Sequence, residues 1–369
     1  MGRITRRTVL QNIGVGTLGS VSIVGGAVAD GPTREIVTVR SGDESLVTKE
    51  VPQSWYQHLN QVRAVNARLQ DRLLDRSGVL AVGIGAGSTA FGGKRGFKID
   101  VQVLAGTTPA VPDQADGVSV NTVERSQRAE PLASCNETNT GDFSSVPAGA
   151  HIGTSIYTND SYGGTVSAHV YDGSGNVRTM TANHVAGGFC SDSTGKTMYQ
   201  GSETYGTVDQ ANKSSDTALI EKTDDDDSFD YTVREDDSTR YDFYGHKTND
   251  GIADLKSSGA TVYKTGITSG TTSGSVQNFE LGADDECAGY YGHAVTSTVE
   301  TGKGDSGAPV YTVEYVSPEP RAIFVHTVNE GEGSSDGSYD CTREIRARWE
   351  ETRGMGFYHL SNDFGLSIV

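Results

Sequence analysis

Three residues in the C-terminal half of this chain have the types that nucleophilic catalysis requires. Ser306 lies in a GDSG stretch, and His184 and Asp216 precede it in the chain. A serine hydroxyl needs a base to take its proton, a carboxylate to orient that base, and N–H groups to hold the developing oxyanion. A histidine before a turn is usually structural when it stands alone. The three residue types together, in the order His, Asp, Ser, indicate catalysis by an activated serine.

The residues around these three predict short strands joined by turns. Glycine is abundant, with 47 residues, whereas proline accounts for only 9. Apolar and polar residues alternate over brief stretches that end in turn formers: 165–172, 177–185, 215–222, 260–267, 273–281, 308–316 and 322–328. Many short alternating runs of this kind indicate an all-β sandwich or a pair of barrels. His184 then lies at the end of one strand and Asp216 at the start of another.

Residues 30–130 have a different pattern, which is typical of a small α/β unit. Apolar residues recur at helical spacing over 51–74, so a helix is expected there. Strands are expected at 78–87, 96–104 and 117–124. The glycine-rich run in the first strand lacks the GxxxxGK[ST] spacing of a phosphate loop and is interpreted as part of a hairpin. Residues 131–149 are polar and rich in turn formers, as expected of a linker.

Four stretches of this sequence resemble motifs of the chymotrypsin-like serine proteases, in their small bacterial and archaeal branch. TANHV, SDTALI and GDSGAPV are similar to the three catalytic blocks, and YKTGITSGTTSGSV is similar to a hairpin of the streptogrisin and α-lytic types. The resemblance covers about residues 134–369. It implies an all-β fold of two six-stranded antiparallel β-barrels at 150–369, preceded by the small α/β domain. It also implies a secreted serine endopeptidase that forms an acyl-enzyme intermediate and uses no cofactor.

The resemblance assigns a role to each residue of the motifs. Ser306 would be the nucleophile, His184 the general base and acid, and Asp216 the residue that orients His184. The backbone N–H groups of Gly304 and Ser306 would form the oxyanion hole. Asp305 would be buried and structural, because related enzymes pair an acid at this place with a new N-terminus.

Two residues compete to define the specificity pocket. Glu300 lies six residues before Ser306, where trypsin-like enzymes place an acid that selects Lys or Arg. His326 lies in a context similar to the histidine with which glutamyl endopeptidases receive a substrate Glu. The two residues would form a mixed pocket if they paired with each other. We expect a preference for acidic residues, although the glycines usual after this histidine are replaced from Val328 onward.

The composition excludes several classes of partner. The formal net charge is −18, so the surface repels polyanions such as nucleic acids and anionic membranes. The histidines do not have the spacing of metal ligands, and no metal or cofactor is expected. The expected partners are protein or peptide substrates, and the expected state is a monomer. Acidic residues spread along the chain, with few lysines, favour a halophilic source over an ordinary acidic secreted protein.

The first 29 residues have the order of an export signal: basic residues, then an apolar run, then a small-x-small triplet. The pair Arg6-Arg7 resembles the twin-arginine motif, whose pathway exports folded proteins. The sequence therefore predicts a secreted protein with no membrane contact after cleavage of residues 1–29. An uncleaved membrane anchor is the alternative, but glycine dilutes the apolar run.

Four cysteines in an exported chain suggest two disulfides, with three possible connectivities. They are Cys135, Cys190, Cys287 and Cys341. Cys287 and Cys341 bracket the Ser306 region, so we favour that pair. None of the four lies in a CxxC pair typical of zinc sites.

Two alternatives stay open at this point. Residues 30–130 resemble the segment that precedes the protease domain in related proteins, and they are either a pro-region that is removed or an accessory domain that is retained. The alternative to an active peptidase is a catalytically silent or latent protein that uses the protease fold for binding.

Overall fold

The computed structural model describes most of the chain outside the predicted export signal. The described residues are 31–125, 133–134, 139–155, 163–188, 190–223, 228–283, 292–316, 318–331, 337–340 and 345–368. Residues 1–29 and the pair Cys287–Cys341 lie outside these ranges. Cys190 is disulfide-bonded. None of the described helices has the length and apolar character needed to cross a bilayer.

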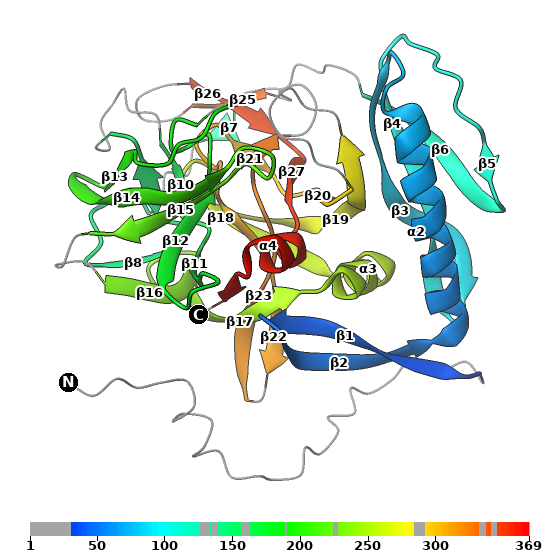
Figure 1. Cartoon of the computed structure of the whole chain (residues 1–369), viewed down its shortest axis with the longest axis horizontal. Coiled ribbons are helices and arrows are strands. Elements are labelled where there is room, and N and C mark those ends of the chain that lie inside the picture. The colour runs from blue at the N-terminus through cyan, green and yellow to red at the C-terminus, as the bar shows by residue number, and fades with distance from the viewer. Residues whose placement is uncertain are drawn as a thin grey trace.

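The fold consists mainly of β-strands, with a small α/β unit at its N-terminal side, as the sequence predicts (Figure 1). The first half of the region 150–369 forms one antiparallel sheet. In spatial order its strands are β10 (Gly163–Thr165), β9 (His151–Gly153), β13 (Thr197–Gln200), β14 (Glu203–Asn212), β15 (Thr217–Lys222), β12 (Val177–Ala182), β11 (Ala168–Tyr171) and β28 (Ser367–Ile368). This sheet holds 8 strands and not six, partly because the C-terminal β28 returns to pair with β11.

The second half contributes the centre of a larger sheet. Its strands run in the order β17 (Arg240–Lys247), β23 (Glu319–Thr327), β22 (Pro309–Val316), β18 (Thr261–Gly266) and β19 (Gly270–Ala283). Strands that join beside this path are β8 (Ser145–Ala148), β16 (Ser228–Arg234), β20 (Ala294–Ser297), β24 (Glu330–Gly331) and β27 (Thr352–Met355). A separate small sheet holds β21 (Thr301–Gly302), β26 (Ile345–Trp349), β25 (Gly337–Asp340) and β7 (Ala133–Ser134).

Two helices belong to the second half. Helix α3 (Asn249–Ser258) begins where Thr248 Oγ1 accepts a hydrogen bond from the Gly251 N–H, and it ends at Gly259 with a left-handed φ of 67°. These are ordinary start and stop signals of a helix. Helix α4 (Phe357–Phe364) precedes the last strand.

The N-terminal unit contains the expected helix and three expected strands, together with a hairpin that was not expected. Its elements are β1 (Thr33–Ser41), β2 (Glu44–Pro52), α2 (Gln53–Leu73), β3 (Val79–Phe91), β4 (Lys94–Leu104), β5 (Gln114–Ala115) and β6 (Val118–Arg125). The hairpin of β1 and β2 was missed because half of its residues are exposed and the buried ones do not alternate cleanly with them.

The N-terminal unit extends the larger sheet at both edges. Strand β1 pairs with β17 through Val39 and Lys247, and β3 pairs with β19 through Ile84 and Phe279. Helix α2 runs between these two attachments (Figure 1). One hydrophobic core includes residues of α2, β3 and β4 together with residues of α3, β18, β19 and β22. The two regions therefore share a core and a sheet.

Ion pairs add to this attachment. Asp254 of α3 accepts from Lys49 at 2.8 Å and from Lys94, both in the N-terminal unit. Arg63 of α2 binds Asp250 and Glu280, each at 2.6 Å. Because Asp254 and Arg63 are largely buried, these pairs are screened less by salt than surface pairs are.

A core substitution tests whether the two regions are one unit. Phe279 is fully buried, and its ring packs edge-on against Phe97 of the N-terminal unit at 5.6 Å between centroids. We expect Phe279→Ala to lower the free energy of unfolding by about 3–5 kcal/mol, because it leaves a cavity. Urea unfolding followed by tryptophan fluorescence and circular dichroism measures this. Tyr315→Ala, at a side chain with 84% exposure, is the control and should change little. Independent regions would instead give two transitions.

Candidate active site

Strand pairing brings His184 and Asp216 together. Strands β12 and β15 are antiparallel neighbours, and Ala182 lies opposite Thr217. His184 follows the end of β12 and Asp216 precedes the start of β15, so the two side chains leave the sheet at the same edge. The Asp216 carboxylate accepts from His184 Nδ1 at 2.7 Å and from the His184 backbone N–H at 2.9 Å. The carboxylate thus fixes both the ring and the backbone of the histidine.

Asn329, which no sequence motif identified, binds the Asp216 carboxylate. Its Nδ2 donates to Asp216 Oδ2 and to the Asp216 carbonyl, each at 2.9 Å. Its Oδ1 accepts from the Met355 N–H at 3.0 Å and from Thr327 Oγ1 at 2.6 Å. Since a backbone N–H can only donate, the orientation of this amide is determined. The only sequence signal was a polar residue directly after the apolar run that contains His326.

Asp216 has a backbone conformation that needs such support. Its φ is 48°, in the left-handed region that few residues other than glycine, asparagine and aspartate adopt. The Asn183 N–H donates to its carbonyl at 3.1 Å, and Asn329 Nδ2 donates to the same oxygen at 2.9 Å. Hydrogen bonds from both sides of the site therefore keep the carboxylate under His184.

The surroundings of His184 favour its protonated form. Burial lowers its pKa, but the Asp216 charge and hydrogen bond, followed by the charge of Glu330, raise it more, so the pKa lies above the ordinary value. With Nδ1 hydrogen-bonded to the carboxylate, Nε2 is the ring nitrogen left to exchange a proton. The side chain is 28% exposed, so a substrate can reach it.

Ser306 lies in the loop between β21 and β22, beside the histidine. Its carbonyl accepts from the Thr165 N–H at 2.7 Å. A Cβ on Gly164 would lie 2.5 Å from the Ser306 carbonyl oxygen and would also meet the side chain of Val185, the residue after His184. Only a glycine allows this approach. The described residues contain no hydrogen bond between Ser306 and His184.

The loop leaves two backbone donors unused. Within the described part of the chain, the N–H groups of Gly304 and Ser306 donate to no acceptor, whereas those of Asp305 and Gly307 bond to the carbonyls of Gly302 and Val328. Gly307 has a φ of 87°, which reverses the chain directly behind the serine. This alternation matches the donors expected of an oxyanion hole.

A buried ion pair between Lys264 and Asp305 stabilises this loop. Asp305 and Lys264 are both fully buried, and their charged groups lie 2.8 Å apart. The Asp305 carboxylate also accepts from Gly302 N and Thr268 N at 2.8 Å and from Ser269 Oγ at 2.6 Å. Burial raises the pKa of Asp305, but the Lys264 charge and these hydrogen bonds lower it more, so the carboxylate is ionised. Asp305 is buried, as expected.

The two specificity candidates do not meet each other. Glu300 Oε2 binds Arg348 Nη2 at 2.8 Å, which neutralises the acid. His326 is fully buried, with Nε2 at 2.7 Å from Ser297 Oγ and Nδ1 at 2.7 Å from the Thr327 carbonyl. Burial lowers the pKa of His326 to about 4, so the ring is neutral. Neither side chain presents a free charge.

No family model and no curated protein matches this chain. Among solved structures, Thermobifida fusca Protease A is 20% identical, with a TM-score of 0.43 over 61% of this chain and 98% of its own. Nocardiopsis protease is 16% identical, with a TM-score of 0.42 over 61% and 98%. Cellulomonas bogoriensis chymotrypsin is 19% identical, with a TM-score of 0.39 over 59% and 97%.

Removing the lysine under the loop should be costly. Lys264→Met leaves Asp305 charged and buried without its partner, so the free energy of unfolding should fall by about 3–5 kcal/mol. Denaturant unfolding of the full chain measures the loss. Arg68→Met is the matched control, because it breaks a pair with Asp116 in which both side chains are about 60% exposed, and such a pair contributes at most about 1 kcal/mol. Equal losses in both variants would contradict the support assigned to Lys264.

The pKa of His184 should depend on Asp216. In Asp216→Asn the negative charge is gone while burial persists, so the pKa should fall below its ordinary value. A raised folded-state pKa means that His184 stabilises the wild type below the unfolded pKa of 6.5 and that this stability is lost as pH rises through the folded pKa. NMR titration of the histidine Cε1–H signals measures the shift. His169, a buried histidine with a pKa of about 4, should not move.

Proposed function

We propose that this protein is a secreted serine endopeptidase. The observation that carries the proposal is the His184–Asp216 pair, hydrogen-bonded at 2.7 Å and held by Asn329, with the Ser306 loop packed beside it. His184 and Asp216 meet at one sheet edge, and Ser306 lies in a loop whose backbone accepts from the Thr165 N–H and comes close to Val185, the residue after His184. Each of the three residues has the type that its proposed role needs.

The proposed reaction has two halves. His184 Nε2 takes the hydroxyl proton of Ser306 as Oγ attacks the peptide carbonyl, and the oxyanion is held by the N–H groups of Gly304 and Ser306. The imidazolium is stabilised by Asp216 and then gives its proton to the leaving amine, so that the peptide C–N bond breaks and an ester to Ser306 forms. In the second half, a water molecule loses a proton to His184 and attacks the ester, and His184 gives this proton to Ser306 Oγ as the ester C–O bond breaks and the acid is released.

Substrate choice is proposed from the pocket residues. The Glu300 carboxylate is already paired with Arg348, so it offers little attraction to a substrate Lys or Arg. A neutral His326 inside the core is not placed to receive a substrate Glu. Arg348 is itself paired, with Glu300 at 2.8 Å and with Glu350 at 3.7 Å, so the acidic preference expected from the sequence rests on the sequence resemblance alone.

The N-terminal unit is proposed to be an accessory domain that is retained. It shares a core and two strand pairings with the protease-like region, which supports retention over release. Export through the twin-arginine route, a halophilic source and a monomeric state are further proposals that rest on the sequence.

A fluorophosphonate probe tests the proposed activity. We expect the wild-type chain, in molar salt, to gain the mass of a single adduct that maps to Ser306. Ser306→Ala should gain none, and an exposed serine variant, Ser202→Ala, should react like the wild type. Loss of Ser306 or His184 should lower kcat about 10⁶-fold, and the double variant should lose little more, because the residues act as a unit.

The same experiment distinguishes an active peptidase from a catalytically silent binding protein. A folded wild-type chain that forms no adduct, and binds peptides as well as Ser306→Ala does, would support a silent binding protein with a protease fold. Adducts on other serines would contradict the role of Ser306.

A further inference from the structure

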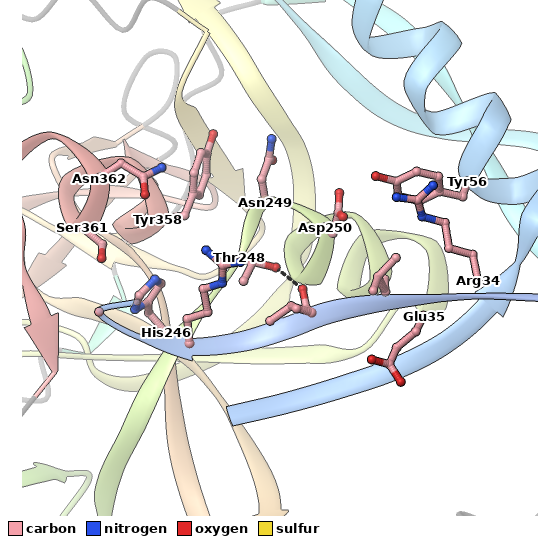
Figure 2. Close-up of a pocket in the computed structure, with 14 residues that line it drawn as sticks. Arg34, Glu35, Tyr56, His246, Thr248, Asn249, Asp250, Tyr358, Ser361 and Asn362 are labelled. Atoms are coloured by element: carbon pink, nitrogen blue, oxygen red, sulfur yellow. Dashed lines mark hydrogen bonds between the residues drawn. The ribbon is translucent and has the colours of Figure 1, made fainter. Parts of the chain in front are cut away.

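A pocket with a volume of about 400 Å³ lies where the N-terminal unit meets the rest of the protein. One wall is β1, a second is the first turn of α3, and a third is α4 (Figure 2). None of its lining residues belongs to the candidate active site. The proposed peptidase chemistry therefore leaves this pocket without a role.

Three polar atoms of the pocket-lining residues are buried without a hydrogen-bond partner among the described residues. They are His246 Nδ1, Asn249 Oδ1 and Tyr358 Oη. His246 is 2% exposed and Tyr358 is 8% exposed. Figure 2 shows the three side chains arriving from different elements. Because buried polar groups in native proteins nearly always have partners, three such atoms around one cavity indicate a polar occupant.

The first turn of α3 adds two unused donors. The N-cap residue Thr248 accepts from the N–H groups of Gly251 and Ile252, each at 2.9 Å. The N–H groups of Asn249 and Asp250 donate to nothing in the described chain. The start of a helix carries partial positive charge and favours anions.

The charged group that acts on His246 at one end of the pocket is the Arg40 guanidinium. Arg40 forms no ion pair with a described carboxylate, and no described carboxylate offsets its effect on His246: burial and then the Arg40 charge lower the pKa of His246 to about 4. Two acids also line the pocket. Asp250 is paired with Arg63 at 2.6 Å. The Glu35 carboxylate lies on the other side of the β1 ribbon from α3 and α4 in Figure 2. The end of the pocket near His246 is therefore electropositive.

We propose that this pocket binds a small carboxylate. Its oxygens lie between the Arg40 guanidinium and the first turn of α3, and the rest of the molecule reaches Tyr358 Oη and Asn249 Oδ1. A water molecule takes about 30 Å³ in the liquid, so a pocket of about 400 Å³ exceeds a single ion and suits a molecule of the size of an amino acid. The bound carboxylate would tie the N-terminal unit to α3 and α4.

Calorimetric titration of the full chain with N-acetylglycine, at constant chloride concentration, tests the proposal. We expect saturable binding to the wild type. Arg40→Gln should weaken it about tenfold or more, since a charge-assisted hydrogen bond is lost. Tyr358→Phe should also weaken it while leaving the unliganded protein as stable as before, because the hydroxyl it removes has no partner. Arg68→Gln, outside the pocket, is the matched control and should bind like the wild type.

Three results would overturn the proposal. N-acetylglycinamide has the same shape without the charge, so equal binding of this amide would show that no carboxylate is recognised. Equal affinity of the wild type and Arg40→Gln would remove the pocket from the binding site. No saturable heat with the folded wild type would show that the pocket holds only water.

Discussion

The buried pair of Lys264 and Asp305 is the constraint on which the Ser306 loop depends. An ionised carboxylate without water must have every lone pair occupied, and here a lysine, two hydroxyl groups and several backbone N–H groups do so. These donors come from strand β18, from the turn between β18 and β19, and from strand β21, which directly precedes the loop. The carboxylate therefore sets the path of the backbone one residue before Ser306, and the loop is ordered by the protein interior without any new chain end.

A second constraint acts on the other half of the site. His184 and Asp216 lie just beyond the ends of two paired strands, which keeps them close together. Asp216 adopts a left-handed backbone conformation there, which costs free energy. Asn329, from the other half of the protein, offsets this strain and links the two halves at the carboxylate. The side-chain amide of Asn329 thus links the two sheets. Its oxygen accepts a hydrogen bond from the backbone of β27.

Much of this arrangement could be predicted from local patterns, and the rest could not. The helix at 53–73 and the strands after it follow from periodicity, and the site residues follow from short motifs. Asn329, Arg348 and the pairing of β1 with β17 depend on contacts between residues far apart in the sequence, which no local pattern contains. His326 was open to a better prediction, because a continuous apolar run around it indicates a strand buried on both faces.

The attachment of the N-terminal unit at both edges of the larger sheet has a consequence for self-association. Strand edges with unpaired N–H and carbonyl groups are templates for pairing with another molecule. In the full chain, β1 covers β17 and β3 covers the end of β19. A chain without residues 31–125 would present both of these edges and an apolar face at once. The N-terminal unit thus protects the chain against edge-to-edge aggregation.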